Sequence, residues 1–318
     1  MSAQSQPSPG PVALLFPGQG SQRTGMGTWL FREVPEMRAI LGTLSAAAGC
    51  DIERLCARGP MNLLSDTRYT QPAMFAMGIA AYLYLAGQGI EASVVAGHSV
   101  GEITALCAAG VLTPKRAAVL VCERGRLMAA APDAGQMALI TGLRRDAVQR
   151  CCADGAAAGR VVIAAQNGPV DHVVSGDEHA VTRCCATALR AGARHAGRLK
   201  TSHAFHSPLM QPIVPGWEAL VRELTMESAL TPVVPNVTAR VTTDPRDLRR
   251  GLLRQLTRPV EWWDTMRTLA GIGVRTVVTC EPGNYLSLLA RNAGLPAVSF
   301  ADPRKVRALV GEFEAVAS

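Results

Sequence analysis

Hydrophobic and polar positions follow one pattern over most of the chain and a different one between residues 135 and 199. Outside that segment, short apolar runs such as residues 12–16 and 94–96 alternate with stretches of helical spacing. Apolar runs of this length are typical of strands in a parallel sheet that helices cover on both faces. The pattern therefore predicts an α/β fold with a mostly parallel sheet.

The segment at residues 135–199 has shorter elements in the order β-α-β-β-α-β, which is the order of a ferredoxin-like unit. The pattern predicts strands at 136–141, 160–165, 171–175 and 196–201, and helices at 145–153 and 178–189. A unit of roughly 65 residues has marginal stability by itself. We therefore expect residues 135–199 to form a small subdomain inserted into one large domain made of residues 1–134 and 200–318.

A G-x-S-x-G motif at residues 97–101 follows the apolar run at 94–96 and precedes a helical pattern. In such a strand–turn–helix arrangement, Gly97 and Gly101 lack the Cβ atoms that would clash, so the turn can expose the hydroxyl of Ser99. Unpaired N–H groups at a helix start favour the negative charge that develops during acyl transfer. Ser99 is therefore predicted to be a nucleophile. The alternative is an ordinary turn flanked by glycines.

The helix predicted at residues 115–130 carries an arginine on its apolar side. Its buried stripe consists of Ala117, Leu120, Val121, Leu127 and Met128. Arg124 lies four residues after Leu120 and three after Val121, so it points inward, whereas Arg126 lies off the stripe and is expected to be solvated. A buried guanidinium needs a partner, and its planar fork suits a carboxylate. Periodicity leaves open whether that carboxylate belongs to an internal acid or to a substrate.

Two histidines, His203 and His206, follow the insert at a spacing of three residues. A metal site would need a third cluster of ligands, and none is evident, so no metal is predicted. One of the two can face Ser99 across a cleft, where a neutral imidazole would act as general base and then as general acid. His98 is expected to point away from the serine because it sits beside it in the turn.

Composition narrows the classes of partner and the compartment. The net charge of +7 comes from scattered arginines, and aromatic residues make up only 4% of the chain, so a nucleic-acid platform is not expected and an acidic partner is favoured. The nine cysteines show no C-x-x-C spacing and are predicted to be reduced. Residues 1–10 lack the features of a signal peptide, and no apolar run is long enough for a membrane span. A cytoplasmic protein with no membrane partner is expected.

Six short segments occur in order along the chain. They are F-P-G-Q-G-S-Q at 16–22, G-H-S-V-G-E at 97–102, R-G-R-L-M at 124–128, N-G-P at 167–169, H-A-F-H-S at 203–207 and E-P-G at 281–283. Together they closely resemble the malonyl-CoA:acyl-carrier-protein transacylase family, which includes the acyltransferase domains of modular polyketide synthases. The resemblance runs from about residue 12 to residue 305.

The resemblance implies an α/β-hydrolase-like core that carries the ferredoxin-like insert. It implies that Ser99 is acylated and that His206 is its base. The other ring nitrogen of this histidine would be held by a backbone carbonyl near Gln255, in place of the acid of a Ser-His-Asp triad. It also implies that the backbone N–H groups of Gln19 and Val100 form the oxyanion hole.

Substrate recognition also follows from the resemblance. Arg124 matches the arginine that binds the malonyl carboxylate, and His203, Phe205 and His98 complete the substrate-binding set. The H-A-F-H sequence looks like the version that goes with malonyl, in which the ring of Phe205 would fill the space needed by an α-substituent.

Two departures from the family pattern leave the acyl group open. Trp262 and Trp263 stand where the family usually has one aromatic residue, and Gln166 replaces the more usual valine before the N-G-P segment. The role of the tryptophan pair is not predicted. One methyl group is worth only about 1–3 kcal/mol in a pocket, so a substituted malonyl group stays an alternative.

The implied reaction uses malonyl-CoA as donor and the phosphopantetheine thiol of an acidic acyl carrier protein as acceptor, with no bound cofactor. Because no ketosynthase or carrier segment is found in the sequence, a free-standing monomer is expected to serve polyketide or fatty-acid biosynthesis in trans. The alternatives are a transferase for a carrier-bound acyl intermediate, a serine hydrolase or thioesterase, and a non-catalytic docking protein.

Overall fold

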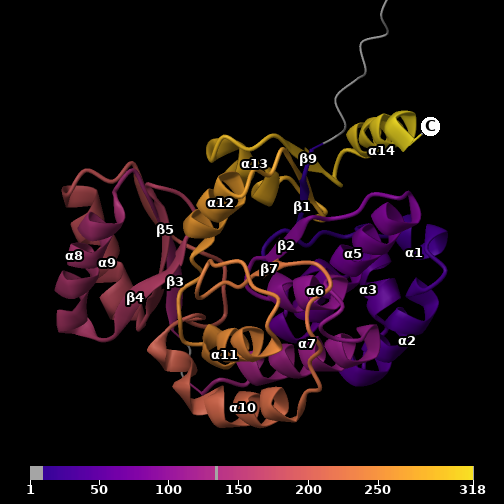
Figure 1. Ribbon diagram of the computed structural model, residues 1–318. Coiled ribbons are helices and arrows are strands. Elements are labelled where there is room, and N and C mark those ends of the chain that lie inside the picture. Colours follow the sequence, from indigo (N-terminus) through magenta and orange to yellow (C-terminus); the bar gives the residue numbers. More distant parts are fainter. Residues whose placement is uncertain (1–9, 133–134, 318) are drawn as a thin grey trace, which may run out of the picture.

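A parallel sheet at the centre of the molecule holds the buried apolar runs, as the pattern predicted (Figure 1). Its five strands lie in the order β7 (Val233–Val234), β2 (Val94–Gly97), β1 (Val12–Phe16), β8 (Thr276–Thr279) and β9 (Ala297–Ser299). The computed structural model describes residues 10–132 and 135–317. The expectation that no signal peptide is present falls mainly on residues 1–9, outside this range.

The register of the two central strands sets the position of the serine turn. β1 pairs with β2 from Ala13 opposite Val94 to Phe16 opposite Gly97, so both strands end at the same level. The N–H of His98 then donates to the carbonyl oxygen of Phe16 over 2.9 Å. The loop after β1 and the turn after β2 therefore lie side by side at the carboxyl edge of the sheet, where ligands bind in open α/β folds.

Helices cover this sheet and extend from it. They are α1 (Leu30–Glu33), α2 (Met37–Ala48), α3 (Ile52–Arg58), α4 (Met61–Leu64), α5 (Thr67–Gly87), α6 (Gly101–Ala108), α7 (Pro114–Ala129), α10 (Val214–Glu223), α11 (Pro245–Gln255), α12 (Trp262–Gly271), α13 (Tyr285–Asn292) and α14 (Pro303–Ala317). A 3-10 helix, η2 (Pro208–Ile213), precedes α10. Thr113 caps α7, because its side chain accepts from the N–H of Arg116.

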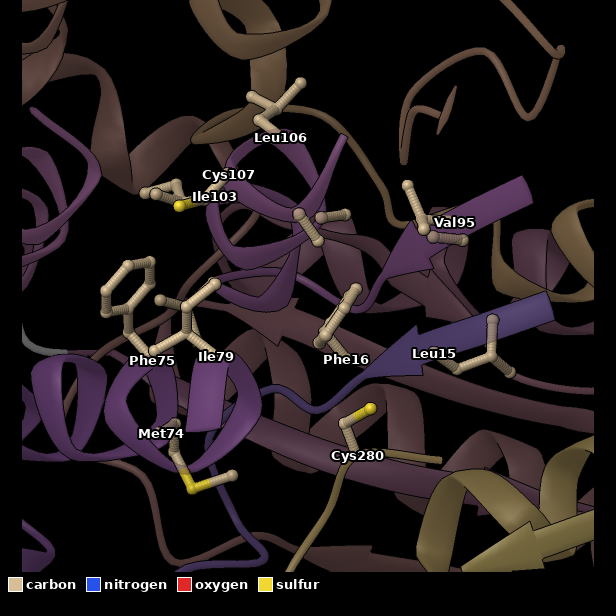
Figure 2. Packing of buried hydrophobic residues seen from close by; sticks show 14 of the residues in the cluster. Leu15, Phe16, Met74, Phe75, Ile79, Val95, Ile103, Leu106, Cys107 and Cys280 are labelled. Atoms are coloured by element: carbon tan, nitrogen blue, oxygen red, sulfur yellow. The ribbon is translucent and has the colours of Figure 1, made fainter. Parts of the chain in front are cut away.

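The main core lies between the central strands and the helices that follow them. Figure 2 shows side chains of β1, β2, α5 and α6 in one cluster, among them Phe16, Ile79 and Ile103. α5 is buried along most of its length. It begins at Thr67, because Asp66 accepts a hydrogen bond from the N–H of Arg68 and caps the helix there.

A second, antiparallel sheet stands beside the main body, as Figure 1 shows. Its strands lie in the order β4 (Val161–Gln166), β5 (Asp171–Gly176), β3 (Gln136–Thr141) and β6 (His195–Arg198). Helices α8 (Arg145–Gly155) and α9 (Glu178–Arg190) cover one face, with the short η1 (Ala156–Ala158) after α8, and share a hydrophobic cluster with the sheet. The predicted ferredoxin-like strand order is confirmed, although β6 ends at Arg198 rather than at residue 201.

The two sheets are joined by the segment that precedes α12. The N–H of Val260 donates to the carbonyl oxygen of Ala164, and the N–H of Gln166 donates to the carbonyl oxygen of Val260, each over 2.9 Å. Beside them, Arg145 of α8 forms an ion pair with Glu261 at 2.6 Å and also donates to the Oε1 atom of Gln166. The side chain of Gln166 therefore takes part in the contact between the two sheets.

All nine cysteines are free thiols, and most of them are buried. Across residues 10–132 and 135–317, no helix is both long enough and apolar enough to cross a lipid bilayer.

Leu14 gives a direct test of the central strand, because its side chain is fully buried in β1. Leu14→Ala is expected to lower the free energy of unfolding by about 3 kcal/mol, since it removes apolar contacts and leaves a cavity. Leu230→Ala is the matched control, because Leu230 is 89% exposed, and little change is expected there. Urea denaturation of the two variants measures the difference, and equal effects would contradict this account of the core.

Candidate active site

The turn that carries Ser99 depends on close backbone packing. Ser99 has a φ of 52°, in the left-handed region that non-glycine residues rarely adopt. A Cβ atom added to Gly97 would collide with the backbone of Gly101, and one added to Gly101 would collide with the carbonyl of Phe16. The two glycines therefore let the turn fold back against β1, and this contact holds the serine in its strained conformation.

Asn236 fastens this turn from the opposite side. Its Oδ1 atom accepts from the N–H of Ser99 over 2.7 Å, and its Nδ2 atom donates to the carbonyl oxygen of Gly97 over 2.5 Å. The sequence analysis did not identify Asn236. Its signal was a polar residue two positions after the end of the strand β7, at the same sheet edge as Ser99.

The hydroxyl of Ser99 and the imidazole of His206 are in hydrogen-bond contact, with Oγ and Nε2 2.7 Å apart. The Nδ1 atom of the ring lies 2.9 Å from the carbonyl oxygen of Gln255 and 3.2 Å from that of Arg258. Carbonyl oxygens only accept, so Nδ1 carries the proton and donates it to them. Nε2 is then unprotonated and accepts from the serine hydroxyl, which is the arrangement that a general base requires.

The surroundings of His206 keep its ring neutral. Burial, followed by the positive charge of Arg124, lowers the pKa of His206 to about 3, while the hydrogen bonds to the two carbonyls oppose this shift. At neutral pH the ring is therefore free to take a proton from Ser99.

Arg124 is buried beside this pair, with 1% of its surface exposed. Its Nε atom donates to Oε1 of Gln255 over 3.1 Å, Nη1 donates to Oε1 of Gln71 over 2.8 Å, and Nη2 donates to Oγ of Ser99 over 3.3 Å. Within the described part of the chain it forms no ion pair, whereas the neighbouring Arg126 pairs with Glu123 at the surface. Helical periodicity left open whether Arg124 pairs with an internal acid or with a substrate. The structure shows no direct pair with an internal acid among the described residues.

Two backbone N–H groups lie at this edge of the sheet, that of Val100 in the serine turn itself and that of Gln19 in the loop after β1. The N–H groups of Gln19 and Val100 donate no hydrogen bond to any residue that the structure describes. Val100 directly precedes α6, and the side chain of Gln19 reaches Oγ1 of Thr67 over 3.3 Å. Unpaired N–H groups next to a nucleophile can stabilise an oxyanion.

The other predicted substrate-binding residues lie around this centre without a hydrogen bond to Ser99 or Arg124. The Nε2 atom of His98 is 3.0 Å from Oδ1 of Asn167, and its ring packs against Trp262 with centroids 5.1 Å apart. Phe205 is buried. His203 is half-buried, with its ring centroid 6.0 Å from that of Phe205.

Two further polar groups at the site escaped the sequence analysis. Gln71 lies on the apolar helix α5, and the side chain of Gln255 reaches Arg124, Ser99 and Glu102 as well as supplying the predicted backbone carbonyl. A polar residue inside an otherwise apolar helical run was the available signal for Gln71.

The fold and the site together define an α/β protein in which a turn serine meets an imidazole and a buried cation. Residues 13–285 match the acyl transferase domain family. The chain is 33% identical over 300 residues to the malonyl CoA-acyl carrier protein transacylase of Bacillus subtilis (strain 168), which covers 93% of this chain and 95% of that protein.

Solved structures agree with this match. The malonyl CoA-acyl carrier protein transacylase of Coxiella burnetii gives a TM-score of 0.91 at 31% identity and covers 96% of this chain and 98% of its own. A malonyl-transacylase solved in complex with a type II PKS acyl-carrier protein gives a TM-score of 0.87 at 33% identity, over 92% of this chain and 96% of that one. The chain belongs to the acyl transferase family, which confirms the resemblance found in the sequence.

Gly101 tests the packing of the turn. Gly101→Ala is expected to lower the free energy of unfolding by about 3 kcal/mol or more, because the new methyl group must displace the backbone at Phe16. Gly87→Ala is the matched control, since no atom lies within 4 Å of the added Cβ at the end of α5. Thermal denaturation followed by circular dichroism compares them, and a stable Gly101→Ala variant would argue against the close contact.

Proposed function

We propose that this protein transfers a malonyl group from malonyl-CoA to the phosphopantetheine thiol of an acyl carrier protein. One observation carries the proposal: the buried guanidinium of Arg124 has no ion-pair partner in the described part of the chain and lies 3.3 Å from the hydroxyl of Ser99. An acyl chain bound as an ester to that hydroxyl would bring a terminal carboxylate next to a charge that no carboxylate of the described residues contacts directly.

In the first half-reaction, Oγ of Ser99 attacks the thioester carbonyl carbon while Nε2 of His206 takes the hydroxyl proton. The negative charge on the former carbonyl oxygen is stabilised by the N–H groups of Gln19 and Val100. The tetrahedral intermediate then collapses, the carbon–sulfur bond breaks, and the CoA thiolate leaves with the proton from His206. The product is a malonyl ester of Ser99.

The second half-reaction runs the same steps toward the carrier. Nε2 of His206 takes the proton of the phosphopantetheine thiol, and the sulfur attacks the ester carbonyl. The ester bond to Ser99 breaks, and the serine oxygen recovers its proton from His206. These groups supply every proton transfer, so the reaction needs no bound cofactor.

Selection of the acyl group would rest on Arg124 and on the wall formed by Phe205. Arg124 favours a chain that ends in a carboxylate, and the buried ring of Phe205 fills space that an α-substituent would need. His203 and His98 would line the same pocket. The backbone carbonyl of Gln255 would fix the tautomer of His206.

The proposed partner is an acidic carrier protein. The solved malonyl-transacylase similar to this chain was captured with its acyl-carrier protein, and the net charge of +7 suits a partner of opposite charge. One chain supplies all the groups named above, which supports action as a monomer. The free cysteines support a reducing, cytoplasmic location. We also propose residues 1–134 and 200–318 as the large domain and residues 135–199 as the small subdomain.

Ser99→Ala tests the covalent step. Wild-type protein mixed with malonyl-CoA is expected to gain the mass of one malonyl group, and Ser99→Ala to gain none, because the attacking oxygen is gone. Intact-protein mass spectrometry measures both. A persisting adduct on the variant would refute Ser99 as the acylated residue. Free malonate formed faster than malonyl carrier protein would instead indicate a hydrolase, and preferential loading of another thioester would indicate a different acyl group.

Arg124→Ala tests the recognition of the carboxylate. We expect kcat/KM for malonyl-CoA to fall by about a hundredfold or more, the size typical of losing a buried charged partner, while loading from acetyl-CoA rises relative to malonyl-CoA. Arg126→Ala is the control, because Arg126 is exposed on the same helix and pairs with Glu123. Unchanged malonyl kinetics in a folded Arg124→Ala variant would count against the proposed role.

A further inference from the structure

One buried acid at the site has no part in the reaction described above. Glu102 lies in the first turn of α6 and is 1% exposed. Its Oε2 atom accepts from Nε2 of Gln255 over 2.6 Å and from the N–H of Asn236 over 3.4 Å. Its Oε1 atom is buried and has no hydrogen-bond partner among residues 10–132 and 135–317. A carboxylate with an unpartnered buried oxygen is costly unless a nearby cation or a bound proton compensates for it.

Gln255 connects this acid to the buried cation. Its amide donates to Glu102 through Nε2, and it accepts from Nε of Arg124 through Oε1 over 3.1 Å. Neither Glu102 nor Arg124 forms an ion pair within the described residues, so a single amide group separates the two opposite charges. Each charge therefore partly compensates the other across the amide of Gln255.

We infer that Glu102 is the internal counter-charge of Arg124. When the malonyl carboxylate binds to Arg124, it takes over as the counter-charge, and Glu102 takes up a proton from solvent. This inference rests on the proposed function. It makes Glu102 a positioning residue that sets how the selectivity for a carboxylated acyl chain depends on pH.

The charge balance favours this exchange. Arg124, ionised Glu102 and a bound malonyl carboxylate would leave one net negative charge in a water-excluded space, whereas protonation of Glu102 restores neutrality. The unpartnered Oε1 atom can accept the proton without loss of a hydrogen bond. Burial already raises the pKa of Glu102 to about 7, against the opposing effects of Gln255, Asn236 and Arg124, and a second anion nearby raises it further.

The other charged or titratable groups around Glu102 keep their state near neutral pH. Arg124 on α7 has its pKa lowered by burial to about 10 and stays charged. His206 has its pKa lowered to about 3 and stays neutral, and burial also lowers the pKa of His98 in the serine turn. Gln255 of α11 and Asn236 do not titrate.

The sign of the effect follows. Below its pKa, Glu102 is already protonated and does not oppose the malonyl carboxylate. As the pH rises through that pKa, Glu102 ionises. A malonyl group then binds either against the repulsion of the Glu102 carboxylate or together with uptake of a proton by Glu102. Preference for malonyl over an uncharged acyl group therefore falls as the pH rises.

The experiment measures kcat/KM for malonyl-CoA and for acetyl-CoA in the loading half-reaction, by following CoA release in a stopped-flow instrument. The quantity compared is the ratio of the two values. The pH dependence of kcat/KM reports groups of the free enzyme and the free substrate, and both substrates share the CoA moiety and the same free-enzyme base, so these titrations cancel in the ratio. We expect the wild-type ratio to fall by about tenfold between about pH 6 and about pH 8.5. Malonyl loading is linked to uptake of at most one proton, and such a linkage changes the ratio by at most about tenfold per pH unit. A flat wild-type ratio would overturn the inference without any variant.

Glu102→Gln provides the second arm. The glutamine can still accept from Gln255 but carries no charge, so the ratio is expected to stay at the high, low-pH value across the range. Thr104→Val, another buried residue of α6, is the matched control and should keep the wild-type profile. A wild-type pH dependence in folded Glu102→Gln would refute the inference. Failure of the wild-type protein to load malonyl at all would refute the proposed function instead.

Discussion

The arrangement around the serine depends on one buried positive charge. Removing a guanidinium from water costs several kcal/mol unless polar groups replace its hydration. In this protein the replacement comes from oxygen atoms of Gln71, Gln255 and Ser99, which lie on α5, on α11 and in the turn after β2. Arg124 can stay buried only where these three elements meet, so it ties two helices to the nucleophile turn.

The imidazole depends on the contact between the two sheets. His206 follows the last strand of the antiparallel sheet, and its ring is oriented by carbonyl oxygens of Gln255 and Arg258. Those carbonyls lie between α11 and Val260, whose backbone pairs with β4. The antiparallel sheet therefore positions the chain that leads to His206. It also pairs with the segment around Val260, next to the carbonyls that fix the tautomer of His206.

The sequence was sufficient for features that have local causes. The spacing of the glycines predicted the turn of Ser99, and helical periodicity predicted that Arg124 points inward. The change in the order of strands and helices predicted the two separate sheets. Asn236 and Gln71 reach the site only through strand register and helix packing, which no local pattern specifies.

In the proposed reaction, the same charge that recognises the acyl chain also weakens the base. The positive charge of Arg124 is the second cause, after burial, of the low pKa of His206. A malonyl carboxylate bound to Arg124 would cancel much of that charge and so allow the pKa of His206 to rise toward its ordinary value. An acetyl group brings no such compensation. Selection for a carboxylated chain would then act on the proton transfer as well as on binding, because the preferred substrate strengthens the base that its own reaction requires.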